Sequence, residues 1–211
     1  MAKGLFITLE GNDGCGKTTQ GKLVFNYLTS LGYEVVHIRE PGGTKISEKI
    51  REIILDKEND EMNDVTEVML YASARAQLVR EVISPAINEG KIVLCDRYVD
   101  SNYAYQGYGR GVDINIVRAI NEIATDGIMP DITLFFDISP DVAMSRRLNE
   151  SSADRLESLG DSFYNKVYLG YKELAGLEPD RIISVNADST PERIFSDVKN
   201  ILQQKILEWR G

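Results

Sequence analysis

The chain has 211 residues, a length that suits one α/β domain with a sizeable core and leaves little room for two. Its net charge of −9 argues against a nucleic-acid coat or an anionic membrane as partner, because the summed field repels polyanions. Two cysteines cannot build a disulfide framework, and no apolar run approaches the roughly 20 residues of a membrane helix. The short apolar run near Met1 is not expected to be a signal sequence, so we expect a cytoplasmic protein.

Apolar and β-branched runs alternate with helical patterns along the chain. Five such runs between helices predict a mostly parallel sheet that is covered on both faces, with right-handed crossovers. The polar stretch 149–160 is interpreted as a mobile loop, with a plain surface connection as the alternative. In chain order the pattern predicts a strand (4–11), a helix (18–32), a strand (33–40), two helices (44–57 and 65–90), a strand (91–98), a helix (114–125), a strand (131–139), two helices (141–148 and 161–176), a strand (181–187) and a last helix (191–209).

Residues 11–18 read G-N-D-G-C-G-K-T and match G-x-x-x-x-G-K-[ST], the P-loop pattern, between a predicted strand and a predicted helix. Glycines let successive N–H groups turn around a phosphate chain, and the helix presents its positive end to the same anion. Lys17 is expected to reach the β- and γ-phosphates, and Thr18 to hold Mg²⁺. A chance glycine-rich turn is the alternative. The residues predicted to bind the nucleotide are Gly11, Asn12, Asp13, Gly14, Cys15, Gly16, Lys17, Thr18 and Thr19.

A P-loop alone is compatible with a GTPase, a motor, a transporter ATPase or a small-molecule kinase. Arginine-rich and aromatic stretches at the predicted carboxyl ends of strands narrow the choice, because open α/β sheets bind ligands at that edge. These stretches are "REPGGT" (39–44), "DRYVDSNYAYQGYGRG" (96–111) and "DISPDVAMSRR" (137–147), and "YASARAQ" (71–77) lies in the long predicted helix.

With "EGNDGCGKTTQ", "PDITLFFD" and "DRLE", these stretches make nearly the whole chain resemble the thymidylate kinases, which convert dTMP to dTDP with ATP. Adenylate and guanylate kinases share the fold but lack "REPGGT" and "AYQG". The resemblance implies one three-layer P-loop NTPase domain over residues 1–211, with a five-stranded parallel sheet flanked by helices. It also implies a short lid over about residues 146–158.

The resemblance also implies roles for residues outside the P-loop. Arg97 corresponds to a clamp on the dTMP phosphate, where a guanidinium can make two parallel bonds, and Asp96 to an acid near the transferring phosphate and Mg²⁺. Tyr71 corresponds to a ring that stacks on thymine, and Arg75, one turn later on the same face, to a donor to the base edge. Further substrate contacts are implied for Asp13 (3′-hydroxyl), Tyr105 (deoxyribose), Gln106 and Ser101 (base edge), and Arg39 and Arg51 (phosphate).

Each of these residues also has an ordinary structural interpretation. Arg97 could pair with Asp96 or another acid, Tyr71 could be a core residue, and Arg51 could be a solvated helix residue. Asp13 could close a local turn. A solvated loop is the alternative for Ser101 and Gln106.

The expected reaction is in-line attack by a dTMP phosphate oxygen on the γ-phosphorus of MgATP. A phosphate monoester is largely ionised near pH 7, so positioning and charge neutralisation matter more than a general base. In the family the additional catalytic arginine lies either in the P-loop or in the lid, and Gly14 occupies the P-loop position here. Because Glu150 stands where lid-type members carry a central arginine, we expect Arg147 or Arg155, rather than Arg146, to reach the phosphates.

Two rival functions remain open on the sequence: a kinase of another nucleotide or of a nucleoside, and a P-loop switch or ATP-binding module that acts through partners. The chain has no N-K-x-D string, which a GTPase would need to recognise its base, and a switch has no use for the arginine-rich stretches. We expect small-molecule substrates, no nucleic acid or membrane partner, and, partly from the resemblance, a homodimer. Apolar helical faces at 65–82 and 114–123 are candidate surfaces for it.

Overall fold

The computed structural model describes residues 3–147, 155 and 160–210. Five strands form one sheet in the order β2-β3-β1-β4-β5, and every neighbouring pair is parallel. The predicted five-stranded parallel sheet is therefore confirmed. Most of the predicted lid, 146–158, lies outside the described residues. The strands are β1 (Leu5–Glu10), β2 (Val35–Arg39), β3 (Ile92–Asp96), β4 (Ile132–Asp137) and β5 (Ile182–Asn186).

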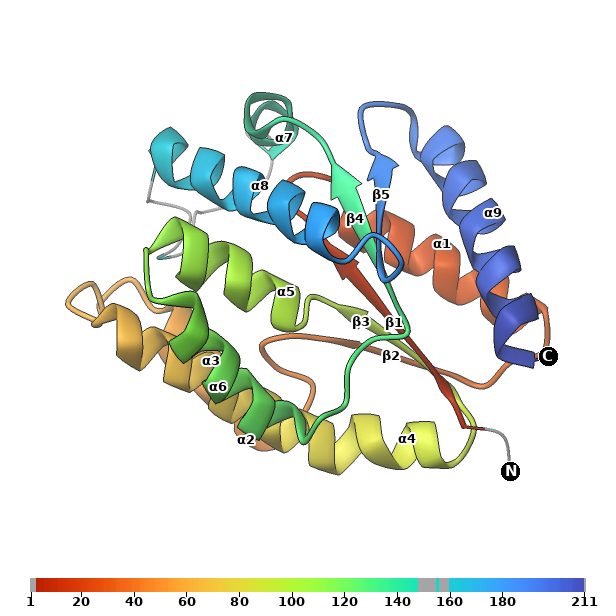
Figure 1. The fold of residues 1–211 in the computed structure, drawn as a ribbon, viewed down its shortest axis with the longest axis horizontal. Helices are drawn as coiled ribbons and strands as arrows, with labels where there is room; N and C mark the ends of the chain where they lie inside the picture. The colour runs from red at the N-terminus through yellow and green to blue at the C-terminus, as the bar shows by residue number, and fades with distance from the viewer. Residues whose placement is uncertain (1–2, 148–154, 156–159, 211) are drawn as a thin grey trace.

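Helices cover both faces of the sheet and give three layers (Figure 1). On one face, α1 and α9 pack together over the strands. On the other face lie the α3–α4 segment, the α5–η2 segment and α8, while α2 and α6 pack against α3. The helices are α1 (Lys17–Ser30), α2 (Lys45–Leu55), α3 (Asp64–Leu78), η1 (Val79–Ile83), α4 (Ser84–Asn88), α5 (Val99–Asn102), η2 (Tyr103–Gly109), α6 (Ile114–Thr125), α7 (Pro140–Arg147), α8 (Gly160–Leu177) and α9 (Pro191–Arg210).

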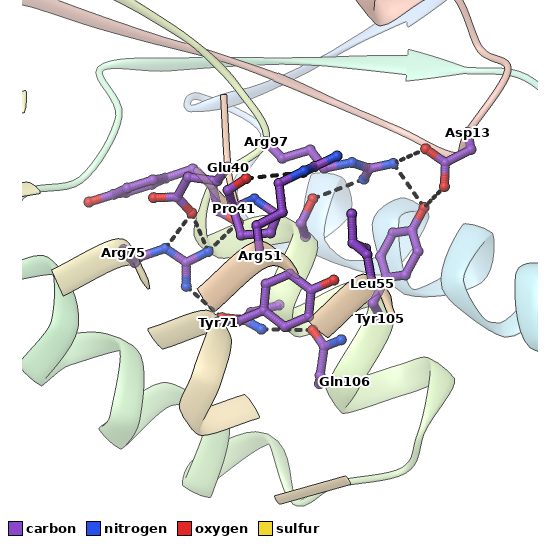
Figure 2. A pocket seen from close by; sticks show the side chains of 13 residues that line it. Asp13, Glu40, Pro41, Arg51, Leu55, Tyr71, Arg75, Arg97, Tyr105 and Gln106 are labelled. Atoms are coloured by element: carbon purple, nitrogen blue, oxygen red, sulfur yellow. Dashed lines mark hydrogen bonds and ion pairs between the residues drawn. The ribbon is translucent and has the colours of Figure 1, made fainter. Parts of the chain in front are cut away.

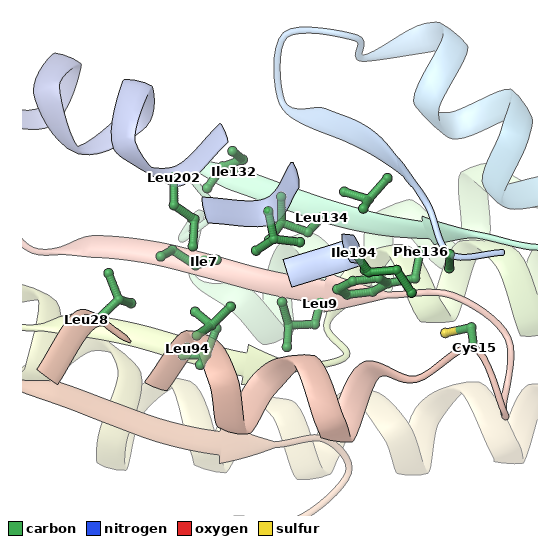
Figure 3. Packing of buried hydrophobic residues seen from close by; sticks show 14 of the residues in the cluster. Ile7, Leu9, Cys15, Leu28, Leu94, Ile132, Leu134, Phe136, Ile194 and Leu202 are labelled. Carbon is green, nitrogen blue, oxygen red and sulfur yellow. The ribbon is translucent and has the colours of Figure 1, made fainter. Parts of the chain in front are cut away.

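The central strand β1 is buried along its whole length because β3 and β4 pair with it on either side. Its residues alternate between the two faces, as the pleat requires. Ile7 and Leu9 pack with Leu28 of α1 and Leu202 of α9 (Figure 3), whereas Phe6 faces the helices of the opposite layer. This packing fixes the end of β1, and with it the start of the P-loop.

The predicted helix over 65–90 is one helical path in three parts, because a π-helical turn, η1, separates α3 from α4. Pro85 lies in the first turn of α4, and proline has no backbone N–H to donate to the turn before it. A wider turn there accommodates the proline without ending the helix. Periodicity alone did not predict this feature.

A second helical segment, α5–η2, lies where no element was predicted. Its two glycines disfavour a helix locally, but neighbouring elements require them. A Cβ at Gly107 would lie 2.3 Å from Ile114 Cδ1 of α6, and a Cβ at Gly109 would lie 2.6 Å from a ring carbon of Phe163 of α8. Tertiary packing therefore overrides the local preference. In the described part of the chain, no helix combines the length and apolar character needed for a membrane crossing.

Candidate active site

The loop between β1 and α1 has the backbone that the P-loop pattern predicts. Gly11, Gly14 and Gly16 have φ values of 140°, 83° and 96°, a region that side chains with a Cβ avoid. Gly14 is also required for space, because a Cβ there would lie 2.1 Å from the carbonyl oxygen of Ala143 in α7. An arginine at this position, the alternative arrangement in the family, is sterically excluded in this structure.

Lys17 is folded back onto the P-loop. Its side chain is buried, and Nζ donates hydrogen bonds to the carbonyl oxygens of Gly11 (2.9 Å) and Asn12 (3.0 Å). The ammonium is therefore held beside the N-terminus of α1, within a pocket of about 570 Å³. The residues that line this pocket include Asp13, Gly14, Cys15, Gly16, Lys17, Thr18, Thr19, Arg39, Asp96 and Arg146.

A second pocket adjoins the first and contains the residues expected to bind the substrate. Of the nine predicted residues, all but Arg39 line it, and Arg39 lines the P-loop pocket instead. Figure 2 shows these side chains converging from loops and helices that are far apart in the sequence. Asp13, Glu40, Arg51 and Arg97 line both pockets, so the two cavities share a wall.

Arg97 is at the centre of this shared wall. Its Nη2 donates to Asp13 Oδ1 (2.6 Å) and to Tyr105 Oη (3.0 Å), and its Nη1 donates to the hydroxyls of Ser101 (3.0 Å) and Tyr171 (3.2 Å). The ion pair is thus with Asp13 of the P-loop and not with the neighbouring acid in the sequence. Arg97 has φ of 71°, a costly backbone conformation for a non-glycine residue and one that clusters at functional sites.

Glu10 lies behind Arg97, fully buried at the end of β1. Its carboxylate accepts hydrogen bonds from Ser101 Oγ (2.6 Å), Tyr171 Oη (2.8 Å) and the backbone N–H of Tyr98 (2.7 Å). Because both hydroxyls donate their hydrogens to Glu10, their oxygens are left to accept from Arg97. Burial, with the nearby charge of Asp100, raises the pKa of Glu10 to about 7, although Arg97 opposes the shift.

Arg75 is buried at the rear of the second pocket, and all five of its N–H groups are engaged. Nε and Nη2 bind Glu40, Nη1 donates to Asn102 Oδ1 and Asn121 Oδ1 (both 2.5 Å), and Nη2 also donates to the carbonyl oxygen of Tyr98 (3.1 Å). A contact with the base edge, as predicted from the resemblance, requires one of these partners to be exchanged. In this structure Arg75 organises the pocket wall.

A directed chain of hydrogen bonds leaves Arg75 through the pocket. Arginine only donates, so the Asn102 oxygen faces it, and Asn102 Nδ2 then donates to Gln106 Oε1 (2.7 Å). Gln106 Nε2 donates in turn to the carboxylate of Glu67 (2.9 Å). Both ends of the chain therefore fix the orientation of the Gln106 amide. Burial alone would raise the pKa of Glu67, but hydrogen bonds from Arg110 and Gln106 outweigh it, and the pKa lies below its ordinary value.

Tyr71 and Arg51 lie at the front of the second pocket (Figure 2). Tyr71 is partly exposed, so the core interpretation of this residue is not observed. Arg51 donates from Nη1 to the carbonyl oxygen of Pro41 (3.0 Å), after a cis peptide bond between Glu40 and Pro41. Arg51 is thus directed toward the cleft that both pockets share.

The three arginines expected to serve the lid differ in position. Arg146 lines the P-loop pocket, where Nη1 donates to the carbonyl oxygen of Ala187 (2.8 Å). Arg155 instead donates to the carbonyl oxygen of Ile54 (2.9 Å) and forms a buried ion pair with Glu67 (2.5 Å), and it does not line the P-loop pocket. Arg147 ends α7, and its side chain lies outside the described residues. The structure thus places Arg146, and not Arg155, at the P-loop pocket, and the expectation for Arg147 stays a prediction.

Sequence reasoning missed several residues that shape the site. Glu40 and Asn102 lie inside stretches that the sequence had singled out, so a search for acids and amides beside arginines would have found them. Glu10 opens the stretch "EGNDGCGKTTQ" and is also a charged residue at the end of a mostly apolar strand, so a search for acids in these stretches would have found it. Glu67 and Tyr171 carried no local signal, since their partners are far away in the chain.

The P-loop pocket and the arginine-lined second pocket share a wall at the carboxyl edge of a parallel sheet. This arrangement defines the protein as a P-loop nucleoside monophosphate kinase. Comparisons with known proteins narrow this class. The family model described as Thymidylate kinase matches residues 9–198, so the chain belongs to the thymidylate kinase family.

Individual proteins that are similar to this chain are thymidylate kinases as well. A thymidylate kinase from Thermoanaerobacter sp. (strain X514) is 50% identical over 202 residues, which are 96% of this chain and 98% of the relative. One from Clostridium novyi (strain NT) is 47% identical over 205 residues, which are 96% of this chain and 100% of the relative. The crystal structure of thymidylate kinase from Ehrlichia chaffeensis superimposes with a TM-score of 0.78 at 31% identity, covering 95% of this chain and 99% of that one.

Proposed function

We propose that the protein transfers the γ-phosphoryl group of ATP to dTMP, forming dTDP for dTTP synthesis, with Mg²⁺ as cofactor. The observation that carries the proposal is the wall shared by the two pockets. Asp13, Glu40, Arg51 and Arg97 line both cavities, so a nucleotide on the P-loop and a monophosphate in the second pocket would meet there. Such juxtaposition is what direct phosphoryl transfer requires.

On the donor side, the P-loop amides and the N-terminus of α1 would bind the phosphates of ATP. Lys17 would exchange the carbonyl oxygens of Gly11 and Asn12 for phosphate oxygens. Thr18 and Asp96 line the same pocket, and Asp96 Oδ1 is buried without a hydrogen-bond partner among the described residues. These oxygen ligands fit Mg²⁺, which would neutralise charge on the phosphates.

On the acceptor side, Arg97 would hold the dTMP phosphate by its planar fork, replacing some of its present hydroxyl partners. The carboxylate of Asp13 accepts from Arg97 and Tyr105 in this structure, and in the complex it would also accept from the 3′-hydroxyl of dTMP. Tyr71 would stack on thymine, and the oriented amide of Gln106 would meet the base edge. The ionised phosphate oxygen then attacks in line without a general base.

A coupled assay over dTMP, dUMP, dCMP and AMP, with MgATP, tests the proposal. We expect dTMP to exceed dUMP by roughly 10-fold or more in kcat/KM, the usual discrimination for one methyl group, and dCMP by more, because its base edge would leave buried groups unpaired. Equal rates with all four monophosphates would favour the rival reading, a less selective nucleotide kinase. No turnover of any of them would remove the proposal.

We also propose a homodimer. Helices α3 and α6 pack side by side, and large apolar side chains on them are exposed: Val65 (45%), Met69 (56%), Ile116 (47%) and Ile123 (77%). Exposed patches of this kind mark interaction surfaces. Light scattering should give twice the chain mass of 23.6 kDa for the native protein. Ile123→Glu should give a monomer, and Leu207→Glu, at an equally exposed position on α9, should not; a native monomer would contradict the proposal.

We also propose a cytoplasmic location, which two free, buried cysteines would suit because that compartment is reducing. Cell fractionation would test it. The substrates ATP and dTMP are small molecules, and the net charge of −9 disfavours nucleic acid or an anionic membrane as a further partner.

A further inference from the structure

A groove of about 600 Å³ lies between α6 and the C-terminal end of α8. It shares no lining residue with the two pockets of the active site. Its size falls within the range of small-molecule sites. The residues that line it are Val99, Tyr103, Tyr108, Ile114, Arg118, Asn121, Glu122, Thr125, Gly127, Met129, Leu174, Leu177 and Glu178.

The walls of this groove are mainly apolar and aromatic. The rings of Tyr103 and Tyr108 come from η2, and Leu174 and Leu177 come from the last turn of α8. Leu177 is 67% exposed, so the groove is open to a molecule from solution at this side. Tyr103 and Tyr108 pack against the cluster that contains Leu174, so these side chains form an apolar surface on which a flat apolar body can lie.

Asn121 provides a hydrogen-bond donor whose direction is fixed. The side chain is 1% exposed, and its Oδ1 accepts from Arg75 Nη1. Since a guanidinium cannot accept, Oδ1 must face Arg75, and Nδ2 must diverge from it. Nδ2 is buried and has no hydrogen-bond partner among the described residues. A buried donor without a partner is unfavourable, so an acceptor at this position would be bound well.

The charges around the groove are nearly balanced. Arg118 is exposed and forms no ion pair with any described residue, while Glu122, four positions later on α6, lies at the same groove. Glu178 is paired with Arg181 at 2.7 Å. The lining therefore offers no net field for a polyanion such as a nucleotide, but it offers N–H donors from Arg118 and Asn121.

The groove is coupled to the substrate pocket through two direct connections. The α5–η2 segment presents Val99 and Tyr103 to the groove and Asn102 and Gln106 to the substrate pocket. In addition, Asn121 bonds the guanidinium of Arg75, which lines the substrate pocket. A ligand that moves either connection changes the pocket wall.

We propose that this groove binds a small, uncharged, planar aromatic molecule with a carboxamide or lactam carbonyl, and that its binding changes the affinity for the phosphoryl acceptor. The ring lies on the apolar surface that the tyrosines of η2 and the leucines of α8 form. Asn121 Nδ2 is closed to solvent in the unliganded protein, so the carbonyl oxygen accepts from it only when α6 or η2 shifts, and that shift is what changes the substrate pocket. The inference goes beyond the proposed kinase activity and concerns a site that the reaction does not use.

Ligand-observed NMR with naphthalene-2-carboxamide as the probe tests the inference, with 2-methylnaphthalene as the comparison that lacks the acceptor. We expect saturable binding of the carboxamide that persists when dTMP is saturating, and weaker binding of the hydrocarbon. Leu177→Glu should abolish binding, whereas Leu169→Glu, at a 63% exposed position on the same helix that does not line the groove, should leave it unchanged. In the kinase assay the probe should change KM for dTMP about fivefold or more, the lower end of usual coupling.

Several results would overturn the inference. On the binding side, these are an absence of saturable binding, displacement of the probe by dTMP, equal binding of both naphthalenes, or an equal loss of probe binding in both leucine variants. On the kinetic side, it is an unchanged KM for dTMP when the groove is saturated with the probe. Neither leucine lines the active-site pockets, so turnover of dTMP by the unliganded variants tests the proposed function separately. A protein that turns over dTMP but ignores the probe would refute this inference alone.

Discussion

Replacing Glu10 by glutamine would test the network beneath Arg97. The carboxylate accepts from the hydroxyls of Ser101 and Tyr171, which is why their oxygens face Arg97. Oε1 of glutamine must stay on the backbone N–H of Tyr98, so Nε2, which can only donate, would face both hydroxyls. Each hydroxyl would then accept from Nε2 as well as from Arg97, and its own hydrogen would lose its acceptor. The shape of the side chain is kept, but the polarity of the network is reversed.

The effect on stability has a defined sign. Burial raises the pKa of Glu10 from 4.5 to about 7, so the folded protein binds this proton more tightly than the unfolded chain does. The resulting contribution to stability is full below pH 4.5 and is lost as the pH rises through 7. A gap of about 2.5 pH units corresponds to about 3 kcal/mol, at about 1.4 kcal/mol for each unit. Glutamine does not titrate, so Glu10→Gln lacks this loss.

Urea unfolding of both proteins at several pH values between 4.5 and 8 measures the effect. The free energy of unfolding of the native protein, relative to Glu10→Gln, should fall by about 3 kcal/mol across this range. Taking the difference removes the contributions of titrating groups that do not interact with Glu10, whereas Asp100 does interact with it. Parallel curves for the two proteins would refute the assignment of a raised pKa to Glu10.

The same network predicts an effect on catalysis. Hydrogen bonds to a charged group are worth about 1.5–3 kcal/mol, so losing one acceptor of Arg97 should lower kcat/KM for dTMP by roughly 10- to 100-fold. Tyr171→Phe removes one such acceptor, and Tyr168→Phe, which removes a hydroxyl bonded to Asp137 on the same helix, is the matched control. Equal activity of the two phenylalanine variants would show that Tyr171 does not support Arg97.

Two further predictions concern the P-loop and the lid. Gly14→Ala should lower the free energy of unfolding by at least about 1–2 kcal/mol through its positive φ alone. It should also raise KM for ATP, because its Cβ would meet the Ala143 carbonyl oxygen at 2.1 Å. Gly176→Ala, in open space on α8, is the control, and equal stability of the two variants would contradict the steric argument. Alanine variants of the lid arginines should separate their roles in single-turnover assays: at least one of Arg146→Ala, R147A and Arg155→Ala should lower kcat by about tenfold or more, and no such loss in any of the three would exclude a lid arginine.

Local pattern was sufficient for the framework of this protein. The alternation of apolar runs and helical periods predicted all five strands, and the glycines of residues 11–18 predicted the P-loop, because both depend on residues close together in the chain. The resemblance then indicated which side chains to examine, and eight of its nine substrate residues line one pocket. The helical segment after β3 was missed, since its glycines are favourable only when α6 and α8 pack against them.

The sequence by itself therefore determined the parallel sheet, the phosphate-binding loop and the set of arginines at the sheet edge. Only the tertiary structure decided which partner each arginine has. Arg75 meets Glu40 and Asn121 across 35 and 46 positions, and Arg97 meets Tyr171 and Asp13 across 74 and 84 positions. Hydrogen bonds of this kind depend on how the layers pack in space, and no short-range pattern in the chain encodes that packing.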